Sequence, residues 1–280
     1  MEILFYFLIF IFGLAVGSFL NCTIYRLQKE EEFLVKRSYC PNCKRTLGWQ
    51  DLIPVLSFVF LKGKCRYCQR PISWQYPLVE ISTALIFLLI FKSQFPWTPL
   101  GGLPEGLITN ELLVLNFNFL KTLYYLAIAS FLIIIFVSDL RYYIIPDKII
   151  YSAIGLALIY NIFLFFVFHH SFKTFLNPLL SAILASAFFL AIVLISRGKW
   201  MGWGDPKLAF FMGLLLGFPN IIVALFLAFL LGAIIGLGLI LTNRKTLKSE
   251  VPFGPFLVTG TFIALFWGNG IIQWYLNLFI

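Results

Sequence analysis

Four carboxylic acids lie inside or at the edge of long uncharged segments of the sequence: Glu80, Asp139, Asp147 and Asp205. An acid in hydrocarbon is costly, so each of the four is a candidate for function. Two carboxyl groups that approach each other titrate jointly and tend to share one proton. The anion of such a pair can activate water while the acid protonates a carbonyl, which is the chemistry of peptide hydrolysis.

The composition predicts the helices that carry these acids. Of 280 residues, 61% are hydrophobic and 12% are charged, and a soluble domain of this size does not bury so much apolar surface. Windows with few or no charges, near the ~20 residues that cross a bilayer, predict an all-α polytopic membrane protein with about eight crossings and the lipid bilayer as a partner. The windows are Ile3–Tyr25, a segment between Arg70 and Lys92, Thr122–Ser138, Ile149–Phe172, Thr174–Ser196, Leu208–Asn243 divided at the turn signal GFPN, and Val251 onward.

We expect five segments along the chain. Residues 1–25 form the first transmembrane helix, 26–76 a basic cytoplasmic loop with four cysteines, and 77–92 the second transmembrane helix. Residues 93–120 form an extracytoplasmic loop, and 121–280 a six-helix aspartic peptidase domain. The first helix follows a glutamate rather than a basic cluster and precedes no small-residue cleavage site, so we expect it to be retained.

The Lys and Arg residues predict the orientation. Eight crossings place eighteen of the 21 cations on the side of loop 26–76, and Lys92, Lys121 and Lys173 on the other. The positive-inside rule makes the first side cytoplasmic. Topology thereby accounts for the net charge of +9, and we expect no nucleic-acid partner.

In this topology Asp139, Asp147 and Asp205 meet at the cytoplasmic face, and Asp139 and Asp205 are the expected pair. Asp139 ends a helix, where the dipole disfavours an anion and an acid has no capping role. Asp205 precedes Pro206 and can cap the next helix, where free N–H groups favour its anion. Asp139 is therefore predicted to be the protonated member. The local sequence fits Asp205 equally well as a helix cap alone, and Asp147 is interpreted first as a cap.

The stretch MGWGDPKL surrounds Asp205 with residues suited to holding a peptide. Gly202 and Gly204 permit the close backbone approach that an extended substrate requires. We assign these glycines, together with Asp147 and Lys207, to substrate positioning. The spacing assigns no chemistry to Glu80, which can also pair with a loop Arg.

Two CxxC pairs, Cys40 with Cys43 and Cys65 with Cys68, are separated by 21 residues. This spacing is typical of a zinc ribbon, in which four thiolates form a closed structural site. Two disulfides or a redox pair are the alternative interpretation, which the predicted cytoplasmic location disfavours.

Taken together, the sequence resembles bacterial type IV prepilin peptidases, membrane aspartic proteases with a fused N-methyltransferase. The resemblance covers nearly the whole chain and rests on several separate motifs in the expected order. These are GSFLN with IYR at 17–26, the paired CxxC loop, ISWQYPLVE at 72–80, SDL through IPD at 138–147, GWGDPKL at 202–208 and VPFGPF at 251–256. Trp74-Gln75 and Pro206 depart from residues that the family often has, which leaves details of substrate and methyl-donor binding open.

The resemblance implies that Asp139 and Asp205 are the catalytic pair and that the cysteines hold structural zinc. It implies removal of the short basic leader of prepilins or pseudopilins, at the cytoplasmic face of the bacterial inner membrane. It also implies methylation of the new N-terminal residue by S-adenosylmethionine, with Asn21, Arg26 and Glu80 as weak candidates for the methyl-donor region. A role in pili, protein secretion or DNA uptake stays open.

Two alternatives to the bifunctional enzyme are retained. A peptidase without methyltransferase activity is the first, since only the resemblance supports the second activity. A metal-sensing transporter is the second, with Asp139, Asp147 and Asp205 as an ion path. The acids gather at one membrane face rather than at the midplane, where transporter sites usually lie, which argues against a transporter.

Overall fold

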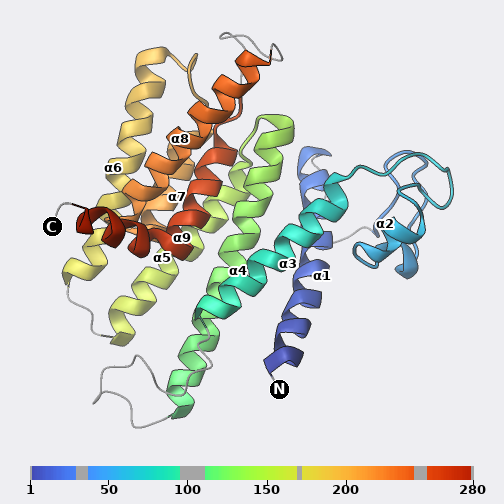
Figure 1. The fold of residues 1–280 in the computed structure, drawn as a ribbon, viewed down its shortest axis with the longest axis horizontal. Helices are drawn as coiled ribbons and strands as arrows, with labels where there is room; N and C mark the ends of the chain where they lie inside the picture. The colour runs from blue at the N-terminus through green and yellow to red at the C-terminus, as the bar shows by residue number, and fades with distance from the viewer. Residues whose placement is uncertain (1, 30–36, 95–110, 169–171, 243–250, 279–280) are drawn as a thin grey trace. The chain divides into compact units, whose positions relative to one another are not determined.

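A computed structural model describes residues 2–29, 37–94, 111–168, 172–242 and 251–278. The described elements are helices, with no strand among these residues and only two isolated bridges, Tyr39 with Thr46 and Lys64 with Pro71. In chain order they are α1 Glu2–Lys29, the 3-10 helix η1 Trp49–Leu52, α2 Leu56–Phe60, α3 Gln75–Gln94, α4 Glu111–Tyr142, α5 Asp147–Phe168, α6 Phe172–Ser196, α7 Gly204–Leu216, α8 Asn220–Leu241 and α9 Gly254–Asn277 (Figure 1).

The helices confirm the predicted all-helical membrane architecture. Among the described residues, seven helices are long and apolar enough to cross a membrane, namely α1, α3, α4, α5, α6, α8 and α9. The remaining predicted crossing is α7, whose 13 residues span only ~20 Å at 1.5 Å per residue. The division between α7 and α8 falls at the predicted turn, where Gly217 has a φ of +64°.

Two parts of the sequence analysis fall on residues outside the described ranges. Arg244, Lys245 and Lys248, which support the predicted orientation, are among them. So are residues 95–110 of the predicted loop 93–120, while α4 already begins at Glu111. The chain divides into two compact units, Met1–Ile134 and Ile135–Ile280.

In the first unit, α1 and α3 pack through small residues. A Cβ atom added to Gly13 would lie 2.5 Å from Cα of Ala84, and one added to Gly17 would lie 2.6 Å from Cα of Glu80. The two glycines are four residues apart and so share one helix face, the small-xxx-small pattern by which membrane helices approach closely. Dispersion contacts between the two backbones therefore hold this pair together.

Residues 37–74, which we call the Cys module, connect α1 and α3 in the same unit. Its two short helices, η1 and α2, lie between the two CxxC pairs. Asp51 ties the module together by accepting hydrogen bonds from Nε of Arg66 at 2.7 Å and from the Gly48 N–H at 3.1 Å.

In the second unit, α7 is the buried helix around which others pack. Leu208, Ala209, Phe211, Met212 and Leu214 are all almost inaccessible. A helix that is apolar on every side is stable only when it is buried on every side. Helices α5, α6, α8 and α9 supply those contacts, and this placement brings the first turn of α7 into the interior of the unit.

Alanine substitutions test the close packing of α1 on α3. Gly17→Ala is expected to lower the free energy of unfolding by about 1–3 kcal/mol, because the added methyl group has no room. Gly155→Ala in α5 is the matched control, since a Cβ there meets nothing within 4 Å, and it should instead stabilise its helix by up to about 1 kcal/mol. Thermal unfolding in detergent measures both changes, and equal shifts for the two variants would contradict the packing.

Candidate active site

Asp139 lies in the last turn of α4 and points to the beginning of α9. Its side chain is buried, and Oδ2 accepts a hydrogen bond from the Gly254 N–H at 2.9 Å. Gly254 is the first residue of α9, so this carboxylate serves as the acceptor for a helix N-terminus that is 115 residues away in the chain. The expectation that Asp139 has no capping role is therefore wrong, because the helix that it caps is not its own.

Only glycine fits opposite Asp139. A Cβ atom at position 254 would lie 2.5 Å from Oδ2 and 3.0 Å from Cγ of the aspartate. Any larger residue must displace the carboxyl group. The α9 N-terminus also offers the positive end of the helix dipole, which favours the Asp139 anion.

Asp205 lies in the first turn of α7 and is also buried. Its Oδ2 accepts a hydrogen bond from the Gly202 N–H at 3.2 Å, so the carboxylate reaches back to the loop before the helix. The helix begins at Gly204 with Trp203 as its N-cap. The interpretation of Asp205 as the N-cap residue is therefore wrong by two positions, although the carboxyl does satisfy a backbone donor near the helix start.

The two carboxyl groups interact. Burial and, as a smaller contribution, the negative charge of Asp139 together raise the pKa of Asp205 to about 7, although the hydrogen bond from Gly202 acts in the opposite direction. The sequence predicted that the helix terminus would favour the Asp205 anion, and desolvation outweighs that effect. At neutral pH the pair can therefore hold one shared proton.

The glycines beside Asp205 have distinct roles. A Cβ atom at Gly204 would lie 2.9 Å from Cβ of Ile145, so this glycine is required by packing against the residue that precedes Pro146. A Cβ atom at Gly202 would meet Oδ2 of Asp205 only at 3.7 Å, an ordinary contact. Gly202 contributes its N–H and leaves space beside the carboxyl.

Asp147 and Lys207 form an ion pair at the surface of the same unit. Asp147 is in the first turn of α5, and its Oδ1 accepts a hydrogen bond from Nζ of Lys207 in α7. The Lys207 ammonium also lies over the ring of Tyr151, 5.2 Å from its centroid. These contacts connect the N-termini of α5 and α7, two residues from Asp205.

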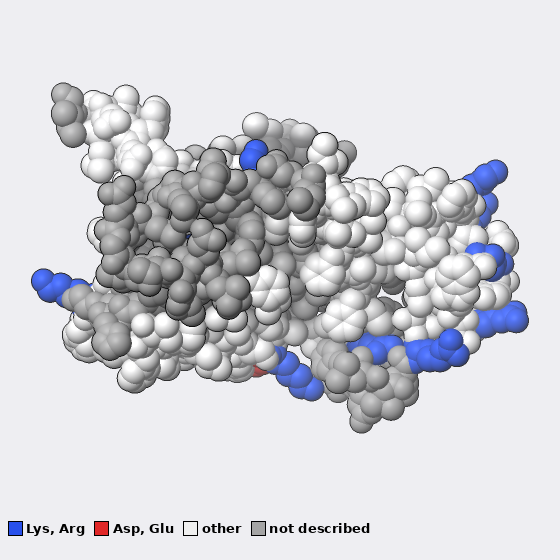
Figure 2. All heavy atoms as spheres, turned by 90° about the horizontal axis from the view of Figure 1, so that it is seen from below, with Lys and Arg blue, Asp and Glu red and all other residues white. Residues whose placement is uncertain are grey.

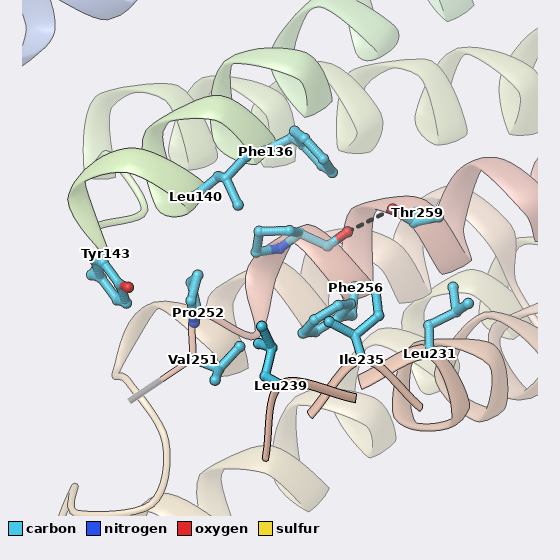
Figure 3. A pocket seen from close by; sticks show the side chains of 11 residues that line it. Phe136, Leu140, Tyr143, Leu231, Ile235, Leu239, Val251, Pro252, Phe256 and Thr259 are labelled. Atoms are coloured by element: carbon cyan, nitrogen blue, oxygen red, sulfur yellow. Dashed lines mark hydrogen bonds between the residues drawn. The ribbon is translucent and has the colours of Figure 1, made fainter. Parts of the chain in front are cut away.

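An apolar pocket of about 400 Å³ lies between α4, α8 and α9 (Figure 3). Phe136 and Leu140 line it from α4, on either side of Asp139 in sequence, and Pro255 follows Gly254. Ile235 of α8 and Phe256 of α9 are on its other walls. The pocket can accommodate apolar side chains, and several of its lining residues are close in sequence to Asp139 and Gly254.

The residues proposed for the methyl-donor region lie in the first unit. Asn21 donates from Nδ2 to the Tyr76 carbonyl at 3.1 Å, and Glu80 accepts the Val55 N–H through Oε2 at 2.7 Å. Arg26 is buried near the end of α1. Each of these hydrogen bonds joins elements of the unit, so a structural role is visible for Asn21 and Glu80.

The four cysteines form one cluster. The Sγ atoms of Cys40, Cys43, Cys65 and Cys68 all lie within 4.8 Å of one another, and those of Cys40 and Cys68 are 3.9 Å apart. Tetrahedral ligands at ~2.3 Å from a zinc ion would be ~3.8 Å apart. The donor set and its spacing therefore fit a metal ion.

Each CxxC pair lies on the same kind of backbone turn. The Cys40 N–H donates to the Arg45 carbonyl and the Cys65 N–H to the Arg70 carbonyl, both at 2.9 Å. Lys44 and Gln69, each four residues after the first cysteine of its pair, both have a φ near +60°. Two equivalent turns thus present their thiols to one point, as in a closed four-ligand site.

Two family models match parts of the chain, and curated relatives match nearly all of it. Residues 11–94 match the bacterial peptidase A24 N-terminal domain, and residues 126–237 match the type IV leader peptidase family. A prepilin leader peptidase/N-methyltransferase of Aeromonas hydrophila is 32% identical over 99% of this chain and 96% of its own length. A protein of the same name from Bacillus subtilis (strain 168) is 30% identical over 97% of this chain and 98% of its own length.

The chain belongs to the type IV leader peptidase family. The resemblance noted from its motifs is thereby confirmed. No solved structure matches this leader peptidase. The match at 126–237 contains Asp139 and Asp205, and Gly254 lies beyond it.

Gly254 is the residue of the candidate site that sequence reasoning missed. The stretch Phe253-Gly254-Pro255 carried a local signal, since a proline near the first helical position marks the beginning of a helix. Nothing local indicated that the carboxylate facing this N-terminus would come from α4.

Metal analysis tests the cysteine cluster of this leader peptidase. Purified protein is expected to carry about one equivalent of a metal that binds thiolates. Cys65→Ser should lose it, because the buried Cys65 thiol faces the other three. Cys22→Ser is the matched control, since Cys22 is outside the cluster; loss of metal from both variants, or from neither, would contradict the assignment.

Proposed function

We propose that this leader peptidase is a membrane aspartic endopeptidase that removes the short basic leader of type IV prepilins or pseudopilins and then N-methylates the new N-terminal residue. The observation that carries the proposal is the pair of buried carboxyl groups, Asp139 and Asp205, each with a backbone N–H on one oxygen. Burial of two acids is costly, and hydrolysis of a peptide bond is a use for such a pair.

The geometry supports a division of labour within the pair. Asp139, whose anion is favoured by the Gly254 N–H, takes a proton from water as the water oxygen bonds to the carbonyl carbon. Asp205, protonated near neutral pH, gives its proton to the carbonyl oxygen. When the C–N bond breaks, Asp139 passes its proton to the leaving amine and the intermediate returns a proton to Asp205. This division reverses the sequence-based prediction.

Several neighbours support substrate positioning. The apolar pocket lined by Phe136, Leu140 and Pro255 favours a substrate with apolar side chains near the scissile bond. Gly202 in the loop before α7 and Gly204 at its first position add no side chains beside Asp205. The ion pair of Asp147 with Lys207 holds the first turn of α7 against α5, and through that turn it positions Asp205.

The cysteine cluster would hold a structural zinc ion. Four protein thiolates leave no ligand position for water, so this zinc would shape the Cys module rather than take part in hydrolysis. S-adenosylmethionine would act as co-substrate and supply the methyl group. Asn21, Arg26 and Glu80 are candidates for its region, and the relatives named N-methyltransferase support that second activity.

We place the enzyme in the bacterial inner membrane with its carboxyl pair at the cytoplasmic face. The support is the distribution of Lys and Arg in the sequence, eighteen to three across the predicted crossings. A substrate whose apolar segment remains in the bilayer would then present its leader next to the pair.

Conservative substitutions test the carboxyl pair. Asp139→Asn and Asp205→Asn are each expected to reduce leader cleavage of a co-expressed prepilin by roughly 100-fold to 10,000-fold, because asparagine keeps the shape but cannot exchange the proton. Membrane levels and metal content, which report on folding, should be unchanged. Retained cleavage in either variant would exclude that residue as a catalytic acid.

Incubation of the purified wild-type protein with prepilin and labelled S-adenosylmethionine distinguishes the bifunctional enzyme from a peptidase alone. Label in the mature N-terminus is the expected result. Cleavage without label would remove the methyltransferase activity and leave the peptidase intact.

A methyl group at position 254 tests the support of Asp139. Gly254→Ala is expected to lower cleavage by about 100-fold, since a displacement of ~1 Å at a reacting group has that effect. Gly270→Ala in the same helix is the control, because a Cβ there meets nothing within 4 Å. Equal activity of the two variants would show that the Gly254 contact does not position the carboxyl.

A further inference from the structure

The Cys module exposes an apolar face. Phe60 is 80% exposed and Trp49 is 74% exposed, and neither belongs to a helix that crosses the membrane. Leu56, Val59 and Phe60 of α2 are spaced so that they share one side of that helix. Soluble surfaces rarely expose so many large apolar side chains together unless they bind something.

The depth of α2 follows from its link to α3. The Val55 N–H, at the N-cap of α2, donates to Oε2 of Glu80 in α3 at 2.7 Å. The 20 residues of α3 span ~30 Å, the thickness of the hydrocarbon core, so Gln75 begins near one membrane boundary. Glu80 then lies ~8 Å further along the helix, and the N-terminus of α2 lies beside it.

Two more observations indicate that α2 is fixed at the depth of the beginning of α3. The ring of Phe58 is 4.9 Å from that of Trp74, the residue immediately before α3. Val55 adopts a φ of +59°, a conformation that is strained for a β-branched residue and persists only where surrounding contacts impose it. The short helix is therefore fixed against the beginning of a membrane helix.

The charge of the module complements an anionic surface. Residues 37–74 contain seven Lys and Arg and one acid, Asp51. Figure 2 shows Lys and Arg side chains gathered on the module. A zinc ion with four thiolates would carry two negative charges and leave the module cationic. Glu30, Glu31 and Glu32 precede it in the sequence and lie outside the described residues.

We propose that the apolar face of the Cys module, formed by Leu56, Val59 and Phe60 of α2, inserts into the membrane interface together with the exposed Trp49, where Lys62 and Lys64 pair with anionic lipid headgroups. Interfacial helices combine aromatic and aliphatic residues on one side with Lys or Arg at the edge in this way. This inference goes beyond the proposed peptidase and does not depend on it. It also accounts for a basic module in an enzyme whose proposed substrate has a basic leader, because lipid phosphates would neutralise those charges.

Photocrosslinking in the full-length protein tests the insertion. The protein would be reconstituted in nanodiscs of phosphatidylcholine mixed with phosphatidylglycerol, with p-benzoylphenylalanine at position 60 or, separately, at position 59. Mass spectrometry of the irradiated protein should show lipid adducts at both positions. The exposed Asn42, on the first cysteine turn, is the control position and should give few. Absence of lipid adducts at both 59 and 60 would overturn the proposal.

The same preparation tests whether the apolar face contacts lipid or prepilin, and whether the charges of Lys62 and Lys64 contribute to the contact. Added prepilin should not displace the lipid adducts, and adducts to prepilin alone would make this face a peptide-binding surface instead. Lys62→Gln combined with Lys64→Gln, or nanodiscs of phosphatidylcholine only, should lower the adduct yield by about fivefold or more at low salt, as expected for ~1 kcal/mol per cation. An unchanged yield would overturn the pairing with anionic headgroups.

Discussion

Two buried carboxyl groups impose the main constraint on the second unit. A carboxylate removed from water needs hydrogen-bond donors, and here each of the two acids receives a backbone N–H. Gly254 must be glycine because Asp139 fills the space where a side chain would be. The donor to Asp205 is the N–H of Gly202, in the loop before α7. Because Gly202 has no side chain, the space on that side of the carboxyl stays open. Holding the two acids therefore requires glycine at position 254 of α9 and a backbone donor at Gly202 in the loop before α7.

The short helix α7 is what places Asp205 inside the unit. It is too short to span the hydrocarbon core, and it is surrounded by α5, α6, α8 and α9, so its first turn can hold an acid inside the unit. Gly204 lets that turn pack directly on Ile145. The ion pair of Lys207 with Asp147 fixes the turn from its exposed side.

Whether the sequence predicts a feature of the structure depends on how far apart in the chain the interacting residues are. Hydropathy identifies the seven long helices, because burial in lipid acts on every residue of a segment, and the local residues GFPN identify the turn at Gly217. The spacing of Cys40, Cys43, Cys65 and Cys68 predicts their cluster, because the ligands of one ion must converge. The contact of Asp139 with Gly254 joins residues 115 apart, and no local pattern records it. The prediction that the pKa of Asp205 is lowered was wrong, since helix-end arguments omit the desolvation that dominates at this residue.

The pH dependence of leader cleavage tests the shared proton most directly. A group whose pKa is raised to about 7 holds its proton below that pH and loses it above. With purified wild-type protein and a prepilin substrate, the account predicts a cleavage rate that rises from acid pH as Asp139 ionises and falls as the pH increases through about 7. A rate that stays constant from pH 6 to pH 9 would contradict a catalytic role for protonated Asp205.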